Sequence, residues 1–364
     1  MSGIEEVGDF GTGSTAAFRD ALVAWIDDRR SELEPPYRDH GATEELLSHQ
    51  RRVQRLLFDH GFMRWGWPPE VGGLGGSPLF RAVLGEELTG RGLVHSAAFS
   101  MTEVLGPAVI EFADATLAAE VVPPMLRGDE TWCQGFSEPE AGSDLGSLRT
   151  TAVRDGGAWV LQGQKLWTSW AHHAARCVVL ARTEGPGTGS RGISAFFVDM
   201  DSPGIDVHPL DTMAGVDEFC ETFFDEVRVP ADRLLGGQGQ GWQVAQHILA
   251  CERGPIFWQR ASWLLHHLGE IADMADAFGL PMANHNTGSQ LHTWATCQWA
   301  ASIRDYLTCE TITGAGGWMD QLLLLDGPYI KDGFVEVTDK PGLGADLNPD
   351  VAEAHLAAGE NWWG

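Results

Sequence analysis

The spacing of the hydrophobic residues changes along this 364-residue chain, and each spacing permits a different kind of secondary structure. Up to about residue 128, apolar side chains recur every three or four positions, as in Phe18, Leu22, Trp25 and Ile26. That spacing places them on one face of a helix. Between 130 and 235 the chain instead forms short runs rich in Val, Phe and Trp, separated by Gly, Pro and Asp. We therefore expect an N-terminal helical domain followed by a domain of β-strands.

The expected elements can be placed along both parts. Within the first part, the pattern predicts further helices over roughly 79–91, 96–112 and 116–127. Within the second, "VRDGGAWVL" is typical of a hairpin, since Asp-Gly-Gly separates two extended runs. This part reads as a small antiparallel sandwich or barrel. From about 239 to 267 the chain returns to a helical pattern.

The last third has a different order of expected secondary-structure elements. "GEIADMADAFG" predicts a helix, "LPMANHN" a strand, "GSQLHTWATCQWAAS" a helix and "RDYLTCETI" a strand. This α-β-α-β order is typical of a parallel α/β fold and not of an antiparallel sandwich. The change falls within 266–270, because Leu264 and Leu265 continue the preceding helix whereas Ile271 and Phe278 belong to the next one. The predicted fold class is therefore multidomain α+β, with a last segment of parallel α/β type.

Charge and cysteine usage exclude several classes of protein. The chain has 24 Lys and Arg against 51 Asp and Glu, a formal charge of −27, which argues against a nucleic-acid partner but permits a local basic site for a small phosphorylated ligand. None of the six cysteines forms a CxxC pair, so a disulfide or zinc framework is not expected. No apolar run approaches the roughly 18 to 20 residues of a membrane helix. The acidic N-terminus lacks a signal-peptide pattern, and we expect a cytoplasmic protein with no membrane partner.

Three motifs give the first two-thirds a specific identity. They are "SEPEAGSD" (137–144), "KLWTS" (165–169) and "FFDEVRVPADRLLG" (223–236). In this order and spacing they strongly resemble the acyl-CoA dehydrogenase family over about residues 15–265. The resemblance implies a helical domain over 1–128, a β-domain over 129–238, and over 239–268 the first helix of a C-terminal domain whose remaining helices are missing.

The resemblance also implies FAD as cofactor. By match to the motifs, backbone or side chains of Phe136, Ser137, Gly142 and Ser143 would contact the flavin and the thioester. Trp167 and Ser169 would flank the isoalloxazine ring. These residue types suit the task, because small residues admit backbone N–H groups close to the ring and an aromatic covers it from water. In isolation, "PEAGSD" indicates only a tight turn.

Glu252 is the candidate catalytic base. The reaction of the family removes an α-proton by a carboxylate while the β-hydrogen leaves as hydride to flavin N5. One helix face would carry Glu252 among apolar side chains, which would raise its pKa. By spacing, the other members of that face are Trp242, Ala245, Ile248, Leu249 and Ile256. In one branch of the family the base lies at the matching place. The alternative is an ordinary ion pair with Arg253 or another cation.

Residues 270–364 resemble a different family. "IADMADAFGLPMANHN" and "VTDKPGLGADLN" are similar to the enolase superfamily in its mandelate racemase and sugar-acid dehydratase branch. The resemblance implies an incomplete α/β-barrel fragment over 269–364. By match, His285 would be the catalytic histidine at the end of the seventh barrel strand and Glu310 the acid after the eighth. The magnesium ligands, the base lysine and the other strands of the barrel are missing, so we expect these residues to be relics and no metal site.

The sequence thus predicts a chimera. The first hypothesis is an FAD-dependent acyl-CoA dehydrogenase by lineage, acting in fatty-acid or steroid side-chain β-oxidation, with an acyl-CoA substrate and an electron-transfer flavoprotein as acceptor. Loss of the C-terminal helices would impair it. The alternatives are a non-catalytic remnant of the flavin fold and, less favoured, an enolase-type dehydratase or racemase. A homo- or hetero-oligomer is expected from the resemblance, although the family assembles through helices that are missing here.

Overall fold

The structure is a computed structural model that describes residues 14–36, 43–185, 187–213, 215, 217–286, 288–311, 317–340 and 343–356. The chain divides into two compact units, residues 1–266 and 267–364. Each unit is described by itself below. Among the described helices, none combines the length and apolar composition needed to cross a membrane.

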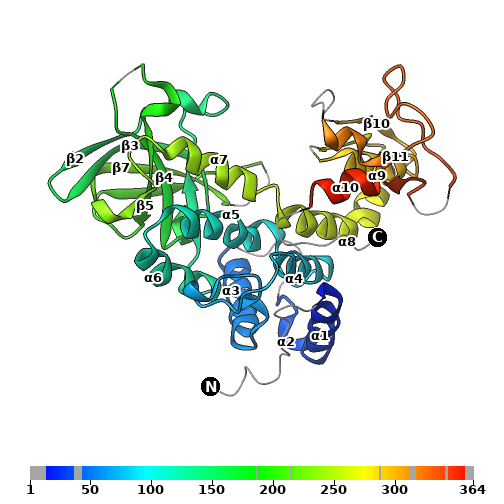
Figure 1. The fold of residues 1–364 in the computed structure, drawn as a ribbon, viewed down its shortest axis with the longest axis horizontal. Helices are drawn as coiled ribbons and strands as arrows, with labels where there is room; N and C mark the ends of the chain where they lie inside the picture. The colour runs from blue at the N-terminus through cyan, green and yellow to red at the C-terminus, as the bar shows by residue number, and fades with distance from the viewer. Residues whose placement is uncertain are drawn as a thin grey trace. The chain divides into compact units, whose positions relative to one another are not determined.

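The N-terminal part of the first unit is helical, as the sequence predicts (Figure 1). Its helices are α1 (Thr15–Asp28), α2 (Arg30–Leu33), α3 (Thr43–Asp59), α4 (Leu79–Gly90), α5 (Ser96–Phe112) and α6 (Ala115–Leu126). Phe18, Leu22 and Ile26 are fully buried, so the apolar face of α1 forms part of the core. Helix α6 begins where the side chain of Asp114 accepts a hydrogen bond from Thr116 N, the usual way to satisfy an exposed helix N-terminus.

The middle part is an eight-stranded sheet. Its strands are β1 (Trp132–Gly135), β2 (Thr151–Asp155), β3 (Ala158–Ser169), β4 (Arg176–Arg182), β5 (Ile193–Asp199), β6 (Ile205–Pro209), β7 (Phe219–Pro230) and β8 (Leu234–Leu235). The order is β6-β7-β3-β2-β4-β5-β8, with β1 beside β4. The pairs β1–β4 and β2–β4 are parallel. The purely antiparallel arrangement expected from the sequence is therefore wrong, because alternation fixes which face a side chain occupies but not the direction of the neighbouring strand.

The hairpin between β2 and β3 is confirmed. Asp155 pairs with Ala158, which leaves Gly156 and Gly157 as a two-residue turn. Gly156 has φ 61°, in the left-handed region that glycine adopts readily. The sheet is buried on both faces: one side joins the helical core, and the other packs around Trp159, Phe196 and Phe224.

The helical pattern after 239 consists of two helices rather than one. Helix α7 (Gly241–Cys251) packs along α5 and against β5, and α8 (Pro255–Ala277) follows after a short turn. The break has a local cause in Pro255, the first residue of α8. Proline has no N–H to donate to the preceding turn, but it is well suited to the first position of a new helix. Consequently Glu252 lies just after the last residue of α7.

The second unit keeps the α-β-α-β order expected from the sequence. Strand β9 (Met282–Asn284) pairs in parallel with β10 (Tyr306–Cys309), and α9 (Gln290–Ala300) connects them. A second pair, β11 (Leu323–Leu324) with β12 (Asp346–Leu347), precedes α10 (Pro349–Ala354). Two parallel strands are far from a closed barrel.

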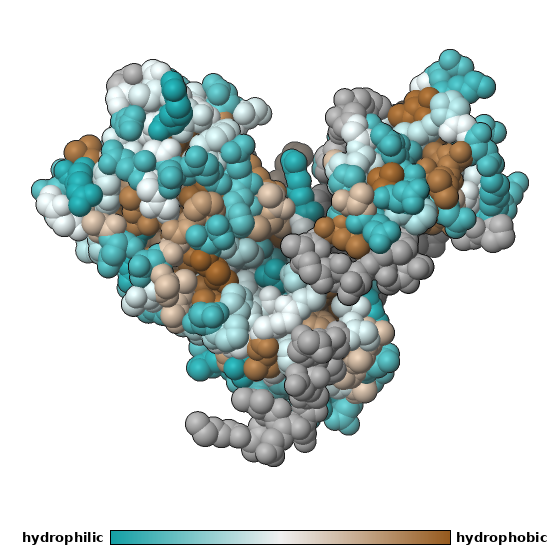
Figure 2. All heavy atoms as spheres, viewed as in Figure 1, coloured by the Kyte–Doolittle hydropathy of each residue, from teal (hydrophilic) through white to brown (hydrophobic). Residues whose placement is uncertain are grey.

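Large apolar side chains of the second unit remain in contact with solvent. Phe278, Leu307 and Phe334 are each at least 70% exposed. Figure 2 shows apolar residues among hydrophilic ones on the viewed face. Exposed apolar side chains of this size are expected where a fold lacks the elements that would normally cover them.

Candidate functional site

The motifs "SEPEAGSD" and "KLWTS" meet beside β3, and the site formed there by Phe136, Ser137, Trp167 and Ser169 is called the strand edge below. β1 ends at Gly135, and the next residues run beside β3, where Leu166 N donates to Ser137 O at 2.9 Å. The ammonium group of Lys165 donates to Phe136 O at 3.1 Å. The structure therefore brings Phe136 and Ser137 next to the strand that carries Trp167 and Ser169.

A buried ion pair fixes this edge. Lys165 has no exposed surface, and its Nζ lies 2.8 Å from Oε1 of Glu138. Glu138 also accepts hydrogen bonds from the backbone N–H groups of Arg149 (2.6 Å) and Thr150 (2.9 Å). Burial lowers the pKa of Lys165 to about 8, even though Glu138 raises it. Burial alone would raise the pKa of Glu138, but Lys165 and the two amides hold it below its usual value. Lys165 was missed as a site residue although it stands inside the "KLWTS" motif.

Trp167 and Ser169 lie at the surface on either side of a buried residue. Thr168 between them is 1% exposed, whereas Trp167 is 56% exposed. Trp167 has φ 63°, an unusual backbone conformation for a large side chain. Its ring meets Phe219 of β7 edge to face, with centroids 5.8 Å apart. A strained, exposed tryptophan on an otherwise well-packed strand indicates a surface that a planar ligand could cover.

The turn between Glu138 and Ala141 leaves the following backbone open. Glu138 and Ala141 exchange backbone hydrogen bonds of 2.9 and 3.1 Å, which confirms a tight turn in "EPEA". A Cβ placed on Gly142 would meet no atom within 4 Å, so its backbone is accessible from outside. Ser143 is likewise exposed. Close approach of a ligand to this backbone is therefore unobstructed.

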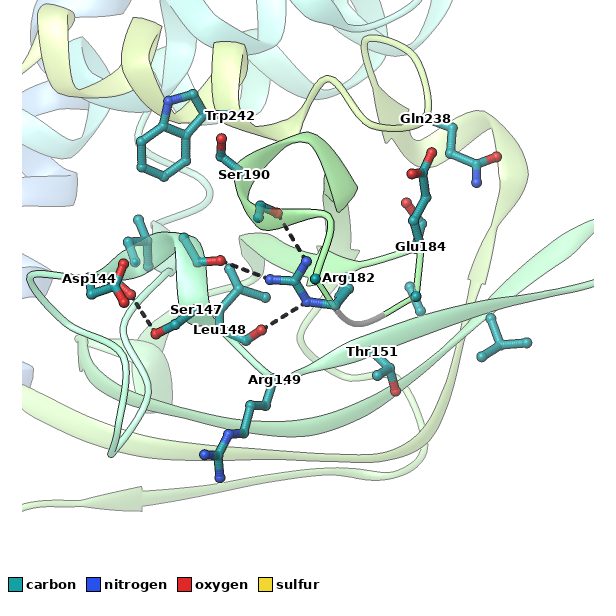
Figure 3. A pocket seen from close by; sticks show the side chains of 18 of the residues that line it. Asp144, Ser147, Leu148, Arg149, Thr151, Arg182, Glu184, Ser190, Gln238 and Trp242 are labelled. Atoms are coloured by element: carbon teal, nitrogen blue, oxygen red, sulfur yellow. Dashed lines mark hydrogen bonds between the residues drawn. The ribbon is translucent and has the colours of Figure 1, made fainter.

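Ser143 is one of the residues that line a groove of about 1320 Å³. Figure 3 shows this groove. Its wall is organised by Arg182 of β4, whose guanidinium donates to the carbonyls of Leu148 (3.1 Å), Gly146 (2.9 Å) and Gly189 (3.0 Å). These bonds tie the turn after the "AGSD" motif to the loop that precedes β5. The guanidinium of Arg182 is thus engaged with backbone carbonyls and shapes the wall of the groove.

Two further arginines line the same groove. Arg149 is 78% exposed at its side chain and pairs with Glu140 at 2.5 Å, and Arg154 lies over the ring of Trp159 at 5.6 Å. Asp144 and Glu184 supply the acidic groups of the lining. In a chain with a formal charge of −27, this is a local basic site of the kind that suits a phosphorylated ligand.

Glu252 belongs to the end of α7 and not to the strands and turn that carry the strand edge. It caps the C-terminal end of α7, its side chain is 34% exposed, and Oε1 lies 3.6 Å from Arg260 Nη2 of α8. The cationic partner is Arg260, whereas the sequence suggested Arg253 or another cation. Of the residues that the sequence placed with Glu252 on one helix face, Ala245, Ile248 and Ile256 are buried in the core. Leu249 is 41% exposed, so the predicted apolar face is wrong at that position.

Helix α5 contains a buried carboxylate that the sequence analysis did not select. Glu103 is 3% exposed and lies 3.3 Å from Arg81, which in turn covers the ring of Trp67 at 4.2 Å. Burial raises the pKa of Glu103, and Arg81 offsets only part of that effect. In the sequence it is one of many acidic residues, so only its burial distinguishes it.

In the second unit the structure brings together the two expected relics. His285 Nδ1 lies 2.6 Å from Glu310 Oε2, just after β9 and β10. The side chains of His285 and Glu310 are 80% and 50% exposed, and Asn286 N donates to the same carboxylate at 2.9 Å. This pair lies in water rather than in a closed pocket.

The residue types at and near the strand edge suit the flavin ring of FAD. Ser137 and Ser169 supply hydroxyl groups, Trp167 an exposed aromatic face, and Gly142 a backbone that no side chain covers. This set suits a planar ring with polar edges.

Family models match the chain in three segments. Residues 13–129 match the acyl-CoA dehydrogenase N-terminal domain, residues 133–227 match the acyl-CoA dehydrogenase middle domain, and residues 265–351 match an enolase C-terminal domain-like model.

Curated relatives agree with the first two segments. The chain is 38% identical over 244 residues to acyl-CoA dehydrogenase IpdE1 of Mycobacterium tuberculosis, covering 65% of this chain and 62% of that protein. It is 32% identical over 268 residues to cyclohexane-1-carbonyl-CoA dehydrogenase of Geobacter metallireducens, covering 72% and 69%. The chain therefore spans less than two thirds of the length of IpdE1.

A solved structure, the Tcur3481-Tcur3483 steroid ACAD, shares the fold with a TM-score of 0.59 at 27% identity, over 79% of this chain and 70% of that one. The motifs, the sheet and these matches lead to one conclusion: the chain belongs to the acyl-CoA dehydrogenase family through its N-terminal and middle domains, and is joined to an enolase C-terminal domain-like segment.

Proposed function

We propose that the chain is an FAD-dependent acyl-CoA dehydrogenase by lineage, which binds an acyl-CoA thioester and catalyses its α,β-dehydrogenation. The observation that carries the proposal is that Ser143, which stands in the same motif as Ser137, lines the arginine-containing groove. A ligand with a reactive end and a phosphorylated end needs both kinds of surface close together along the chain.

The strand edge would hold the flavin. Ser137 and Ser169 would donate hydrogen bonds to its polar rim, Trp167 would cover the ring, and the backbone at Gly142 and Ser143 would lie close to it. Bound FAD supplies the hydride acceptor. Lys165 pairs with Glu138 and donates to Phe136 O, and so joins the two motifs. In this way it positions these groups without touching the ligand.

The groove would hold the anionic CoA portion. Arg149 and Arg154 are the cations whose side chains remain near solvent there, and phosphate groups form strong charge-assisted hydrogen bonds with guanidinium. The names of the relatives favour a bulky acyl group: one acts on cyclohexane-1-carbonyl-CoA and another is a steroid ACAD. A ring system, as in steroid side-chain β-oxidation, is therefore the substrate class that we propose.

Glu252 would act as the base that removes the α-proton. To do so its carboxylate must leave Arg260 or lose that partner when substrate binds, because a carboxylate held by a guanidinium is not free to reach the α-proton. An electron-transfer flavoprotein would then reoxidise the enzyme.

The test is spectroscopic. The full chain is purified, incubated with FAD and desalted, and its visible spectrum is recorded before and after anaerobic addition of a cyclic acyl-CoA. We expect a yellow protein that bleaches. A protein that stays colourless with added FAD would contradict the proposal.

Glu252→Gln separates catalysis from binding. We expect this variant to retain the flavin spectrum but to bleach at least about 100-fold more slowly, the usual contribution of a general base. Glu70→Gln, an exposed carboxylate on a short helix of the N-terminal part, is the matched control and should bleach normally. Normal bleaching of Glu252→Gln would assign the base to another residue.

The second candidate is a non-catalytic protein that retains the flavin fold. The Glu252–Arg260 ion pair and the shortened match to the relatives favour it. Yellow colour without bleaching would support this alternative. We further propose that the second unit is an inactive barrel fragment, since the His285–Glu310 pair is open to water. The paired names of the solved ACAD suggest that a two-chain assembly is the oligomer to test first.

A further inference from the structure

Two consecutive histidines lie beside an aspartate where the helical part of the first unit meets the sheet. His172 and His173 form a single helical turn, η5 (Ala171–His173), directly after β3. Asp217 comes from the segment before β7. One ring nitrogen of each histidine and a carboxylate oxygen of Asp217 all lie within 4.8 Å of one another. Neighbouring histidines in a sequence have no metal-ligand spacing by themselves, so only the fold reveals this cluster.

The position of His172 is unusual for a structural histidine. Its Nδ1 lies 2.9 Å from Cys220 Sγ, whereas its buried Nε2 faces Asp217 Oδ2 at 3.5 Å. Metal-ligating histidines typically bond a second group through the nitrogen that does not bind the ion. His172 has that arrangement, with one nitrogen occupied and the other directed into the cluster.

The spacing matches the size of a coordination shell. Two ligands that are each about 2.1 Å from a tetrahedral ion lie about 3.4 Å apart. The 3.5 Å between His172 and Asp217 is close to that value. Glu44 of α3 adds a fourth candidate, since its Oε2 lies 3.1 Å from His173 Nδ1. Thr43 donates to the other oxygen of Asp217 and so orients the carboxylate.

The protonation states also suit a cation. Burial, with the neighbouring His173, lowers the pKa of His172, so its imidazole is neutral at pH 7. The hydrogen bond from Thr43 lowers the pKa of Asp217, so it carries a negative charge. A neutral imidazole and an ionised carboxylate are the forms that bind metal.

We propose that His172, His173 and Asp217 form a binding site for one transition-metal ion of the Zn²⁺ type, with Glu44 at its edge. Two imidazoles and carboxylates suit zinc, cobalt, nickel or copper, whereas magnesium prefers oxygen ligands only.

The site has a defined place in the fold. Trp170, which follows Ser169, has φ 53° and packs against Leu46 and Leu47 of α3. The ion would therefore hold the N-terminal end of α3 against the end of β3, a few residues from the strand edge that carries Ser169. Its role is to fix this contact, and it does not depend on the proposed dehydrogenase activity.

The experiment uses the full chain, stripped with EDTA and dialysed, and titrated with Co²⁺ while its visible absorption and its metal content are measured. We expect one Co²⁺ per chain, displacement by Zn²⁺, no displacement by Mg²⁺, and a higher melting temperature with the metal bound. Binding of no Co²⁺, or displacement by Mg²⁺, would overturn the proposal.

Variants assign the ligands. His173→Gln and Asp217→Asn should each weaken Co²⁺ binding at least about 10-fold, since loss of a group that merely supports a ligand already has this effect. Asp217 is half exposed, so its variant should fold even if the histidine variant does not. His208→Gln is the matched control, because His208 pairs with Asp206 at 2.9 Å on the exposed strand β6 and lacks a third ligand. Equal affinity of Asp217→Asn and the unaltered protein would place the metal at another group and refute the site.

Discussion

The Lys165–Glu138 ion pair is the residue-level contact on which the strand edge depends. Removing one partner of a buried pair leaves an uncompensated charge, which typically destabilises a protein by about 3–5 kcal/mol. We expect Lys165→Met to lower the free energy of unfolding by that amount, measured by urea denaturation.

An exposed pair provides the control for this prediction. Arg149 and Glu140 are 78% and 68% exposed at their side chains, and exposed pairs contribute about 0–1 kcal/mol. Arg149→Met should therefore change stability by less than about 1 kcal/mol. Comparable losses of unfolding free energy in Lys165→Met and Arg149→Met would show that burial does not make the Lys165–Glu138 pair more important for stability than an exposed pair.

Glu103 predicts a pH dependence of stability. Because burial raises its folded-state pKa above 4.5, the folded protein holds this proton in a pH range where the unfolded chain has lost it. Stability contributed by this group is therefore present below pH 4.5 and decreases as the pH rises toward the raised pKa. Glu103→Gln removes this decrease.

The measurement compares chemical denaturation of the two proteins over a pH series. We expect the variant to gain stability relative to the unaltered protein as the pH rises. Glu103→Gln also loses the ion pair with Arg81, which changes its free energy of unfolding at every pH. The diagnostic quantity is therefore how the difference in unfolding free energy between the two proteins changes with pH. A difference that stays constant from pH 4 to 8 would contradict the raised pKa.

At the scale of elements, the contact between α7 and β5 depends on the absence of a side chain. A Cβ on Gly241, the first residue of α7, would lie 2.5 Å from the backbone carbonyl carbon of Ser194. Alanine normally favours a helix over glycine, but here steric overlap with a rigid strand outweighs that gain. We expect Gly241→Ala to destabilise the protein by about 1–3 kcal/mol, measured as a shift of the denaturation midpoint. Gly157→Ala is the control, because no atom lies within 4 Å of its Cβ, and equal effects of the two substitutions would refute the steric explanation.

The elements themselves follow closely from the sequence. The expected helices 79–91, 96–112 and 116–127 correspond to α4, α5 and α6 within a residue, because apolar spacing and helix caps act over one or two turns. The parallel neighbours of β4 could not be predicted, because strand partners are chosen by contacts far apart in the sequence. In the sequence, Pro255 indicates a break, whereas the continuous apolar pattern predicts one helix across it. The structure has the break.

At the scale of the whole molecule, the two units contain separate sets of buried residues. The described hydrophobic clusters lie entirely within 1–266, whereas Trp294, Cys297 and Leu323 are buried in the second unit. Units with their own interiors unfold independently when few contacts join them. We expect two calorimetric transitions for the full chain.

Substitutions can assign the two transitions. Lys165→Met should lower only one transition. Asn286→Ala should lower only the other, since Asn286 is 1% exposed and its amide donates to Thr293 and to Glu310 O. A single transition shifted by both variants would show that the two units unfold cooperatively.

The sequence alone determined the family and most of the local structure, because the motifs and the apolar spacing are properties of contiguous residues. It proposed Ser137, Ser143, Trp167 and Ser169 as cofactor-binding residues, and it placed the change of structural pattern within 266–270. Only the tertiary structure decided which charges meet. The Lys165–Glu138 pair joins residues 27 positions apart, the bond from Arg182 to Gly146 O joins residues 36 positions apart, and the His172–Asp217 contact joins residues 45 positions apart. Hydrogen bonds and ion pairs act over a few ångströms, so these sites exist only after the chain has folded and brought their members together.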